Sequence, residues 1–217
     1  SDLDVSTGAV IITGDTARKE NAKEVLQILS GMAGDFVVAT AGPDLESIIA
    51  GKGSGAYGYS EQKNTSIVNF DIGGGTTEIA FIVSGGAAVS KSVKIAGDHL
   101  NEDIMEYVKE KHNLLIGEKT AEDLKVNTIS MPDKNATFEI RGRELGVGLP
   151  KSIKIVAQEI DSAIDKNIDL IIDEIKLTME EIEPEVAADI YETGIYLSGG
   201  GAGIRILKEK IEKQLKL

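Results

Sequence analysis

The sharpest chemical signal in the sequence is the segment Asn69-Phe-Asp-Ile-Gly-Gly-Gly-Thr-Thr-Glu78. An apolar strand is expected to carry Asp71 to its end, where a carboxylate suits a hydrated Mg²⁺ ion of the kind that accompanies phosphates. Three successive glycines let backbone N–H groups approach an anion with no Cβ in the way. We therefore predict a phosphate-binding loop, with Asp71 as the metal residue, directly or through water, and as the candidate catalytic residue. The loop residues are Gly73, Gly74, Gly75, Thr76 and Thr77.

The structural alternative for this segment is a plain glycine hairpin between two strands. Such a hairpin needs glycine at one or two left-handed positions, whereas this segment has three glycines after an aspartate. A Walker loop is excluded, because the segment has no Gly-Lys-Ser/Thr and no helix is expected after it.

A second triple-glycine loop lies in Leu197-Ser-Gly-Gly-Gly-Ala202, after an apolar strand and before a helix. Backbone amides at the start of a helix suit a phosphate or the face of a nucleoside. Alone, this segment fits a structural strand-to-helix turn equally well. Together, the two loops indicate one shared ligand site, to which we assign Ser198, Gly199, Gly200, Gly201 and Ala202.

The elements that would position these loops follow from the hydrophobic pattern. Glycine-bounded apolar runs predict an antiparallel meander around the first loop, with strands at 66–72, 78–83 and 87–95. Runs at 9–13 and 36–39, with a helix over 17–29 between them, predict a parallel β-α-β unit. An isoleucine stripe predicts one long helix over 158–183 that Pro184 ends. Further helices are expected from Pro43 and at 98–111, 120–124 and 204–215, and further strands at 138–142, 152–156 and 194–197.

These motifs, set in an α/β pattern, resemble the superfamily of actins, sugar kinases and heat-shock ATPases. The first glycine loop resembles its second phosphate loop, and the second resembles its adenosine loop. The resemblance implies an actin-like ribonuclease-H-type lobe that binds ATP or ADP with Mg²⁺, with an antiparallel meander plus parallel strands. It further implies a truncated first lobe with its crossover helix at 1–51, a core lobe at 52–97 and 151–217, and a small inserted α+β subdomain at 98–150.

Two closer resemblances cover different parts of the chain. Residues 8–80, through the segments 11–22 and 34–51, are similar to the reactivating chaperone of ethanolamine ammonia-lyase (EutA). Residues 71–210 are similar to the bacterial actins of the MreB family, through Gly97-Asp98 and the segments 113–125, 139–143 and 195–202. Because the two resemblances meet in one chain, a hybrid or engineered chain is one hypothesis for its origin.

The MreB resemblance adds four residues to the expected site. It implies that Glu122 and Lys125 contact the ribose and base and that Gly97 and Asp98 belong to the nucleotide site. The structural alternatives remain open. Glu122 and Lys125 at i and i+3 also fit a solvated ion pair on a helix, and Gly97-Asp98 also fits a turn that caps the following helix.

The resemblance also leaves two catalytic features of the superfamily without a counterpart in this chain. The superfamily opens with an Asp-x-Gly-Thr phosphate loop, and this sequence begins beyond that point. Its catalytic glutamate precedes a proline, whereas Gly42 precedes Pro43 in this chain, and Glu46 lies one helical turn further on. These differences imply at most a weak ATPase, and whether the chain is an enzyme is left open.

Composition excludes several other classes of site. The sequence has no cysteine and only two histidines, which excludes disulfides, thiolate catalysis and His-rich metal cages. A net charge of −13 with no basic patch excludes nucleic acid as a partner. No apolar run is long enough to span a membrane, and no signal segment is recognised, so we expect a cytoplasmic protein.

Three hypotheses for function remain open. The first is an actin-like protein that binds adenine nucleotide with weak or absent hydrolysis. The second is a reactivating chaperone whose partner is ethanolamine ammonia-lyase, and the third is an MreB-like filament or self-associating scaffold that does not use nucleotide. We also expect a homo-oligomer, because a sheet made only of the strands at 9–13 and 36–39 leaves an unpaired edge.

Overall fold

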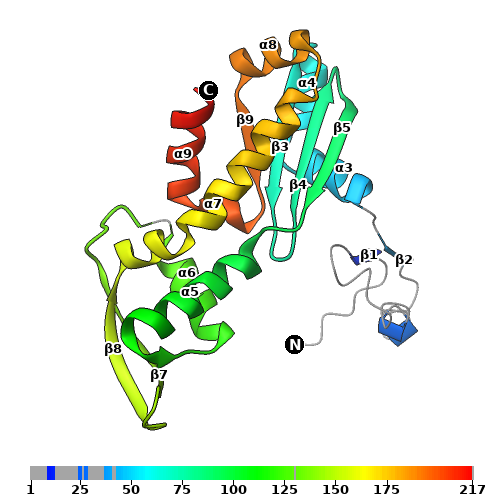
Figure 1. Cartoon of the computed structure of the whole chain (residues 1–217). Coiled ribbons are helices and arrows are strands. Elements are labelled where there is room, and N and C mark those ends of the chain that lie inside the picture. The colour runs from blue at the N-terminus through cyan, green and yellow to red at the C-terminus, as the bar shows by residue number, and fades with distance from the viewer. Residues whose placement is uncertain are drawn as a thin grey trace.

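A computed structural model describes residues 9–12, 24–25, 27–28, 37–40, 43–129 and 131–216. The described chain contains three sheets, with strand orders β1-β2, β5-β4-β3-β9 and β6-β7-β8. Figure 1 shows the second and third sheets at opposite ends of the long helix α7 (Ala157–Glu180). The mixed α/β class expected from the sequence is confirmed.

The central sheet is built around β3 (Ser66–Ile72). This strand pairs antiparallel with β4 (Thr77–Val83), which pairs antiparallel with β5 (Gly86–Val93). On its other side β3 pairs parallel with β9 (Ile195–Ser198). The predicted meander and the added parallel strand are therefore confirmed, and both glycine loops follow strands that are neighbours in the sheet.

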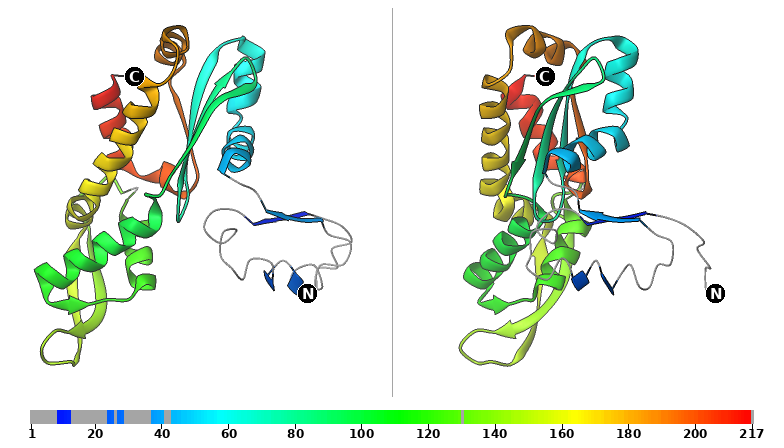
Figure 2. Two further views of the ribbon diagram at one scale, coloured as in Figure 1. Left: turned by 45° about the vertical axis from the view of Figure 1, so that its right-hand side comes forward. Right: turned by 90° about the vertical axis from the view of Figure 1, so that its right-hand side faces the viewer.

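Alternation along β3 and β4 sends their side chains into two separate cores. Val68, Phe70 and Phe81 face the buried isoleucines of α7 and the apolar side of α9 (Arg205–Leu215). Ile67 and Ile82 face the opposite side, where α3 (Pro43–Gly53) and α4 (Ala56–Lys63) pack. The sheet is thus the middle layer between two helical layers (Figure 2).

The predicted isoleucine stripe is the buried face of α7. Ile160, Ile164, Ile168, Ile171 and Ile175 are all buried, as a stripe repeating every three to four residues requires. The helix ends at Glu180 rather than at 183. Pro184 then occupies the first turn of a further helix, α8 (Pro184–Thr193), which the sequence pattern did not predict.

The third sheet and two helices together form one end of the molecule, at the lower left of Figure 1. Here α5 (Gly97–His112) and α6 (Glu118–Thr128) pack on each other. Strands β7 (Thr137–Glu144) and β8 (Pro150–Val156) form an antiparallel hairpin, and β6 (Leu114–Leu115) pairs with β7. The expected helix at 120–124 proves to be 11 residues long, and β6 was not expected. The short helix η1 (Gly200–Gly203) follows β9.

The N-terminal strands β1 (Ala9–Ile12) and β2 (Val37–Thr40) form a parallel two-stranded sheet of their own, as the predicted β-α-β unit requires. Residues 24, 25, 27 and 28 are helical, and the rest of the helix expected over 17–29 lies outside the described residues. Thr13, Phe36 and Gly42 also lie outside them.

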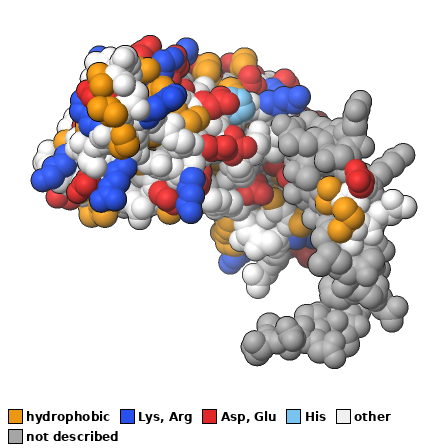
Figure 3. Space-filling model, turned by 90° about the horizontal axis from the view of Figure 1, so that it is seen from below, with side chains coloured by type: hydrophobic (Ala, Val, Ile, Leu, Met, Phe, Trp, Pro, Cys, Tyr) orange, Lys and Arg blue, Asp and Glu red, His pale blue; other side chains and the backbone are white. Residues whose placement is uncertain are grey.

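The surface carries interspersed charges of both signs. On the face shown in Figure 3, Lys and Arg side chains are dispersed among Asp and Glu side chains rather than gathered in one basic patch. Within the described part of the chain, no helix has the length and apolar character needed to cross a membrane.

We expect the α7 stripe to carry much of the fold's stability. Ile168→Ala removes a fully buried side chain and should lower the free energy of unfolding by about 2–5 kcal/mol. The control is Leu170→Ala on the same helix, where the side chain is 41% exposed and the change should stay within about 0.5–1 kcal/mol. Chemical denaturation measures both, and equal losses would contradict this packing.

Candidate functional site

The first glycine loop crosses from β3 to β4 and is attached to the start of α5. Its turn is closed by the Gly73 N–H, which donates to the Thr76 carbonyl at 3.0 Å. The carbonyls of Gly73 and Gly74 accept hydrogen bonds from the N–H groups of Gly97 (3.1 Å) and Asp98 (2.8 Å). Gly97 and Asp98, which were predicted to belong to the nucleotide site, therefore also have a structural role, because their N–H groups hold the loop against the start of α5.

The loop keeps three backbone donors without a protein partner. Within the described residues, the N–H groups of Gly74, Gly75 and Thr76 make no hydrogen bond. The Thr77 hydroxyl differs, because it donates to the Ile95 carbonyl at 2.7 Å. Three successive unpaired N–H groups at a glycine turn offer hydrogen-bond donors that an anion could accept.

The second glycine loop, residues 199–201, packs directly on the end of β3. Gly199 has a φ of +76°, and a Cβ there would overlap Asp71 Oδ1 and the Ile72 carbonyl. A Cβ on Gly201 would overlap the Ile72 side chain, whereas a Cβ on Gly200 would meet nothing within 4 Å. Glycine is therefore required at 199 and 201 by close approach.

The Asp71 side chain lies against Gly199 and is half-buried. Burial raises the pKa of its carboxyl group, and the hydroxyl of Ser198 beside it acts in the opposite direction. Ser198 pairs with Asp71 in the β3–β9 register and accepts a hydrogen bond from the Asn69 amide at 3.2 Å. No cluster of three or more potential metal ligands is found among the described residues.

Lys125 and Glu122 form the other end of the site, on α6. The Lys125 ammonium is buried and donates to the Gly97 carbonyl at 2.9 Å. It also lies 2.6 Å from Glu122 Oε2, and the Asn101 amide donates to the same oxygen at 2.8 Å. Burial would raise the pKa of Glu122, but the hydrogen bonds from Lys125 and Asn101 outweigh it, and the pKa is lowered. This carboxylate is therefore ionised at neutral pH.

A hollow of about 310 Å³ connects these parts. Of the residues predicted from sequence, it is lined by Gly73, Gly74, Gly97, Asp98, Glu122, Lys125, Gly200 and Gly201. The other predicted residues, Asp71, Gly75, Thr76, Thr77, Ser198, Gly199 and Ala202, belong to the two loops but do not line the hollow.

An apolar wall of the hollow was missed in the sequence. It consists of Leu100, Val126, Ile129 and Ile204. The spacing of Val126 and Ile129, four and seven residues after Glu122, places them on the same helix face and could have indicated them. With a glycine loop at one end, a carboxylate at the other and apolar side chains between, the hollow fits a ligand that has anionic, hydroxyl and flat apolar parts.

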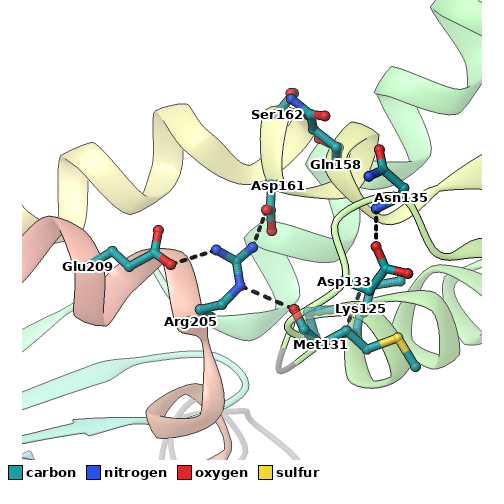
Figure 4. A network of polar contacts seen from close by, with 10 residues as sticks. Lys125, Met131, Asp133, Asn135, Gln158, Asp161, Ser162, Arg205 and Glu209 are labelled. Atoms are coloured by element: carbon teal, nitrogen blue, oxygen red, sulfur yellow. Dashed lines mark hydrogen bonds and ion pairs between the residues drawn. The ribbon is translucent and has the colours of Figure 1, made fainter.

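Arg205 binds the segment that follows α6, and Figure 4 shows its side-chain contacts with Met131, Asp161 and Glu209. Its backbone N–H donates to the Ile129 carbonyl at 2.9 Å, and its Nε donates to the Met131 carbonyl at 3.2 Å. Its remaining guanidinium nitrogens bind Asp161 on α7 and Glu209 on α9. Arg205 thus ties the end of α6 to both helices of the core.

Comparison with known proteins identifies relatives for most of the chain. The family model described as "MreB/Mbl protein" matches residues 45–217. The chain is 37% identical over 174 residues to the cell shape-determining protein Mbl of Bacillus cereus, covering 79% of this chain and 51% of Mbl. It is 39% identical over 150 residues to the cell shape-determining protein MreB of Escherichia coli, covering 68% of this chain and 43% of MreB.

Solved structures agree with this relationship. The crystal structure of MreB5 of Spiroplasma citri bound to ADP superposes with a TM-score of 0.78 at 31% identity, over 97% of this chain and 62% of that one. The corresponding structure bound to AMPPNP gives 0.76 at 31% identity, over 96% and 61%. A double helical filament of MamK, at 22% identity over 95% and 61% of the two chains, gives 0.62 and shows the fold alone. The chain spans about half the length of the curated relatives it matches.

The contact between the two loops predicts different outcomes at neighbouring glycines. Gly201→Ala forces a Cβ against Ile72 and should lower the free energy of unfolding by about 1–3 kcal/mol. Gly200→Ala has open space and should cost less than about 1 kcal/mol. Denaturant titration of both variants provides the comparison, and a Gly200 variant as unstable as the Gly201 variant would be evidence against this packing.

Proposed function

This chain belongs to the MreB/Mbl family, and from that premise we propose that it binds an adenine nucleotide in the hollow between its two glycine loops. The observation that carries the proposal is the hollow itself, which brings residues from both loops and from α6 to one place. The Spiroplasma citri relatives were crystallised with ADP and AMPPNP, which supports adenine nucleotide as the ligand class.

The hollow and the loop residues beside it each suit one part of a nucleotide. The unpaired N–H groups of Gly74, Gly75 and Thr76 receive phosphate oxygens. Glu122 accepts hydrogen bonds from ribose hydroxyls, and Val126 and Ile204 offer apolar surface to the base. Asp71 supplies an oxygen toward Mg²⁺, directly or through water. A single carboxylate suffices, because nucleotide-bound Mg²⁺ keeps several waters and takes its other oxygens from phosphate.

Self-association of the chain is part of this proposal. The β1–β2 sheet has no third strand among the described residues, and unpaired strand edges favour pairing with another chain. A second copy of the chain is therefore the expected partner. Sedimentation with and without ATP tests this, and it separates a nucleotide-dependent filament from a scaffold that ignores nucleotide.

A chaperone role toward ethanolamine ammonia-lyase remains a separate prediction. Of the sequence segments that motivated it, 11–22 lies largely outside the described residues, and most of both 11–22 and 34–51 lies outside the matched family model. A pull-down would test this role: ethanolamine ammonia-lyase should be retained on the immobilised chain and not on an immobilised unrelated acidic protein. The hypothesis of a hybrid chain depends on the same segments.

Glu122→Ala should weaken ATP and ADP binding alike by roughly tenfold, because a charged acceptor of ribose hydroxyls is lost. Pyrophosphate binding at the first loop should be unchanged. Glu118→Ala is the matched control, since it removes an exposed carboxylate from the same helix. Calorimetric titration of the three proteins measures the effect. If Glu122→Ala leaves nucleotide affinity intact, α6 takes no part in the site.

We also expect little or no ATP hydrolysis by the isolated chain. Gly42 precedes Pro43, where the resemblance to the superfamily implies a catalytic glutamate, and assistance by a general base typically supplies about 10²–10⁴ in rate. A phosphate-release assay at saturating ATP and Mg²⁺ should give a rate near the background. Clear release that Asp71→Ala abolishes would show that another carboxylate, such as Glu46 or one from a second copy, activates water.

A further inference from the structure

Asn101 on α5 is a buried polar residue with one unexplained property. Its side chain is 3% exposed, and its amide nitrogen donates to Glu122 Oε2. Its amide oxygen, Oδ1, is buried and has no hydrogen-bond partner within the described residues. A buried acceptor left unpaired costs free energy, so an asparagine here is unfavourable for stability alone. The benefit of asparagine at this position is its hydrogen bond to Glu122.

Because of that bond, the two oxygens of the Glu122 carboxylate differ in their hydrogen bonding. Oε2 accepts from both the Lys125 ammonium and the Asn101 amide. Oε1 has no hydrogen bond within the described residues, and the side chain lines the hollow at 47% exposure. Two donors on one oxygen fix the carboxylate plane. The second oxygen is then left as a preformed acceptor.

The same residues connect the carboxylate to the phosphate loop. Lys125 donates to the Gly97 carbonyl, and the Gly97 N–H donates to the Gly73 carbonyl. Asn101 stands four residues after Gly97 on α5, one helical turn away. Asn101 itself makes no hydrogen bond to the loop within the described residues, so a substitution at 101 acts directly on the carboxylate and reaches the loop only through Lys125.

We propose that Asn101 is a positioning residue that commits Oε2 of Glu122 and so presents Oε1 to the ribose hydroxyls, making the site selective for ribonucleotides over their deoxy counterparts. This inference rests on the proposed nucleotide function. It assigns no ligand contact to Asn101 itself.

The decisive variant is Asn101→Leu, which keeps the branching of asparagine at Cγ, although leucine is larger, and removes both the donor and the unpaired acceptor. The matched control is Asn127→Leu on α6, where an exposed amide donates, as far as the described residues show, only to the Asp123 carbonyl at 2.6 Å. Calorimetry with ATP, 2′,3′-dideoxy-ATP and pyrophosphate separates the ribose from the rest of the ligand.

We expect the wild-type chain to prefer ATP over the dideoxy analogue by about tenfold or more. Asn101→Leu should reduce this preference to less than about threefold while the affinities for the dideoxy analogue and pyrophosphate stay unchanged. In a Glu122→Ala background it should change nothing, because the two residues act through one oxygen.

A ligand-free measurement tests the same bond. NMR titration should give Glu122 a higher pKa in Asn101→Leu, because the removed hydrogen bond lowers it. Unchanged ribose preference, or equal loss of all three ligands, overturns the proposal, as does an unchanged pKa of Glu122. If the wild-type chain binds no adenine nucleotide while the pKa does rise, the proposed function fails and ribose selection fails with it, but the carboxylate positioning stands.

Discussion

The close approach of residues 199–201 to the end of β3 is the constraint from which the site follows. Gly199 and Gly201 leave no room for a Cβ against Asp71 and Ile72, so a side chain at either position would push the second loop away from the end of β3. The pairing of β9 with β3 carries the second loop to the first. The hollow exists because two backbone segments that are distant in sequence touch where side chains would have separated them.

Charge pairs between α7 and α9 support the same arrangement. Asp161, Asp165 and Asp169 recur every four residues on α7, and they bind Arg205 and Lys210 of α9. The spacing forms a ladder along one helix face. These pairs hold α9 against α7. Because Ile204 directly precedes α9 and lines the hollow, they also help to fix that part of the wall.

Sequence patterns predicted the parts of this fold that depend on local chemistry. The meander around residues 73–75 and the stripe of α7 each follow from residues close together in the chain. Strand β6 escaped prediction because a two-residue strand exists only through its pairing with β7. Helix α8 escaped because Ile190 is its only buried residue, which leaves little apolar period to detect.

The site, too, has parts that local sequence predicts and parts that only the fold reveals. The i and i+3 spacing of Glu122 and Lys125 was visible, but the Gly97 carbonyl and the Asn101 amide lie 28 and 21 residues from their partners. Pairings at that separation leave no periodic trace in sequence. The resemblance to bacterial actins therefore indicated which residues belong to the site, and only the fold showed that Lys125 is held by protein groups.

The central claim is that nucleotide occupies the hollow between the two glycine loops, and the amide NMR spectrum tests it most directly. On titration with ADP, the N–H signals of Gly74, Gly75 and Thr76 should move together with those of α6 around Glu122. The signals of Gly146 and Gly148, in the turn between β7 and β8, should stay in place. Saturable shifts confined to other surfaces, with the signals of Gly74 and Gly75 unmoved, would contradict the claim.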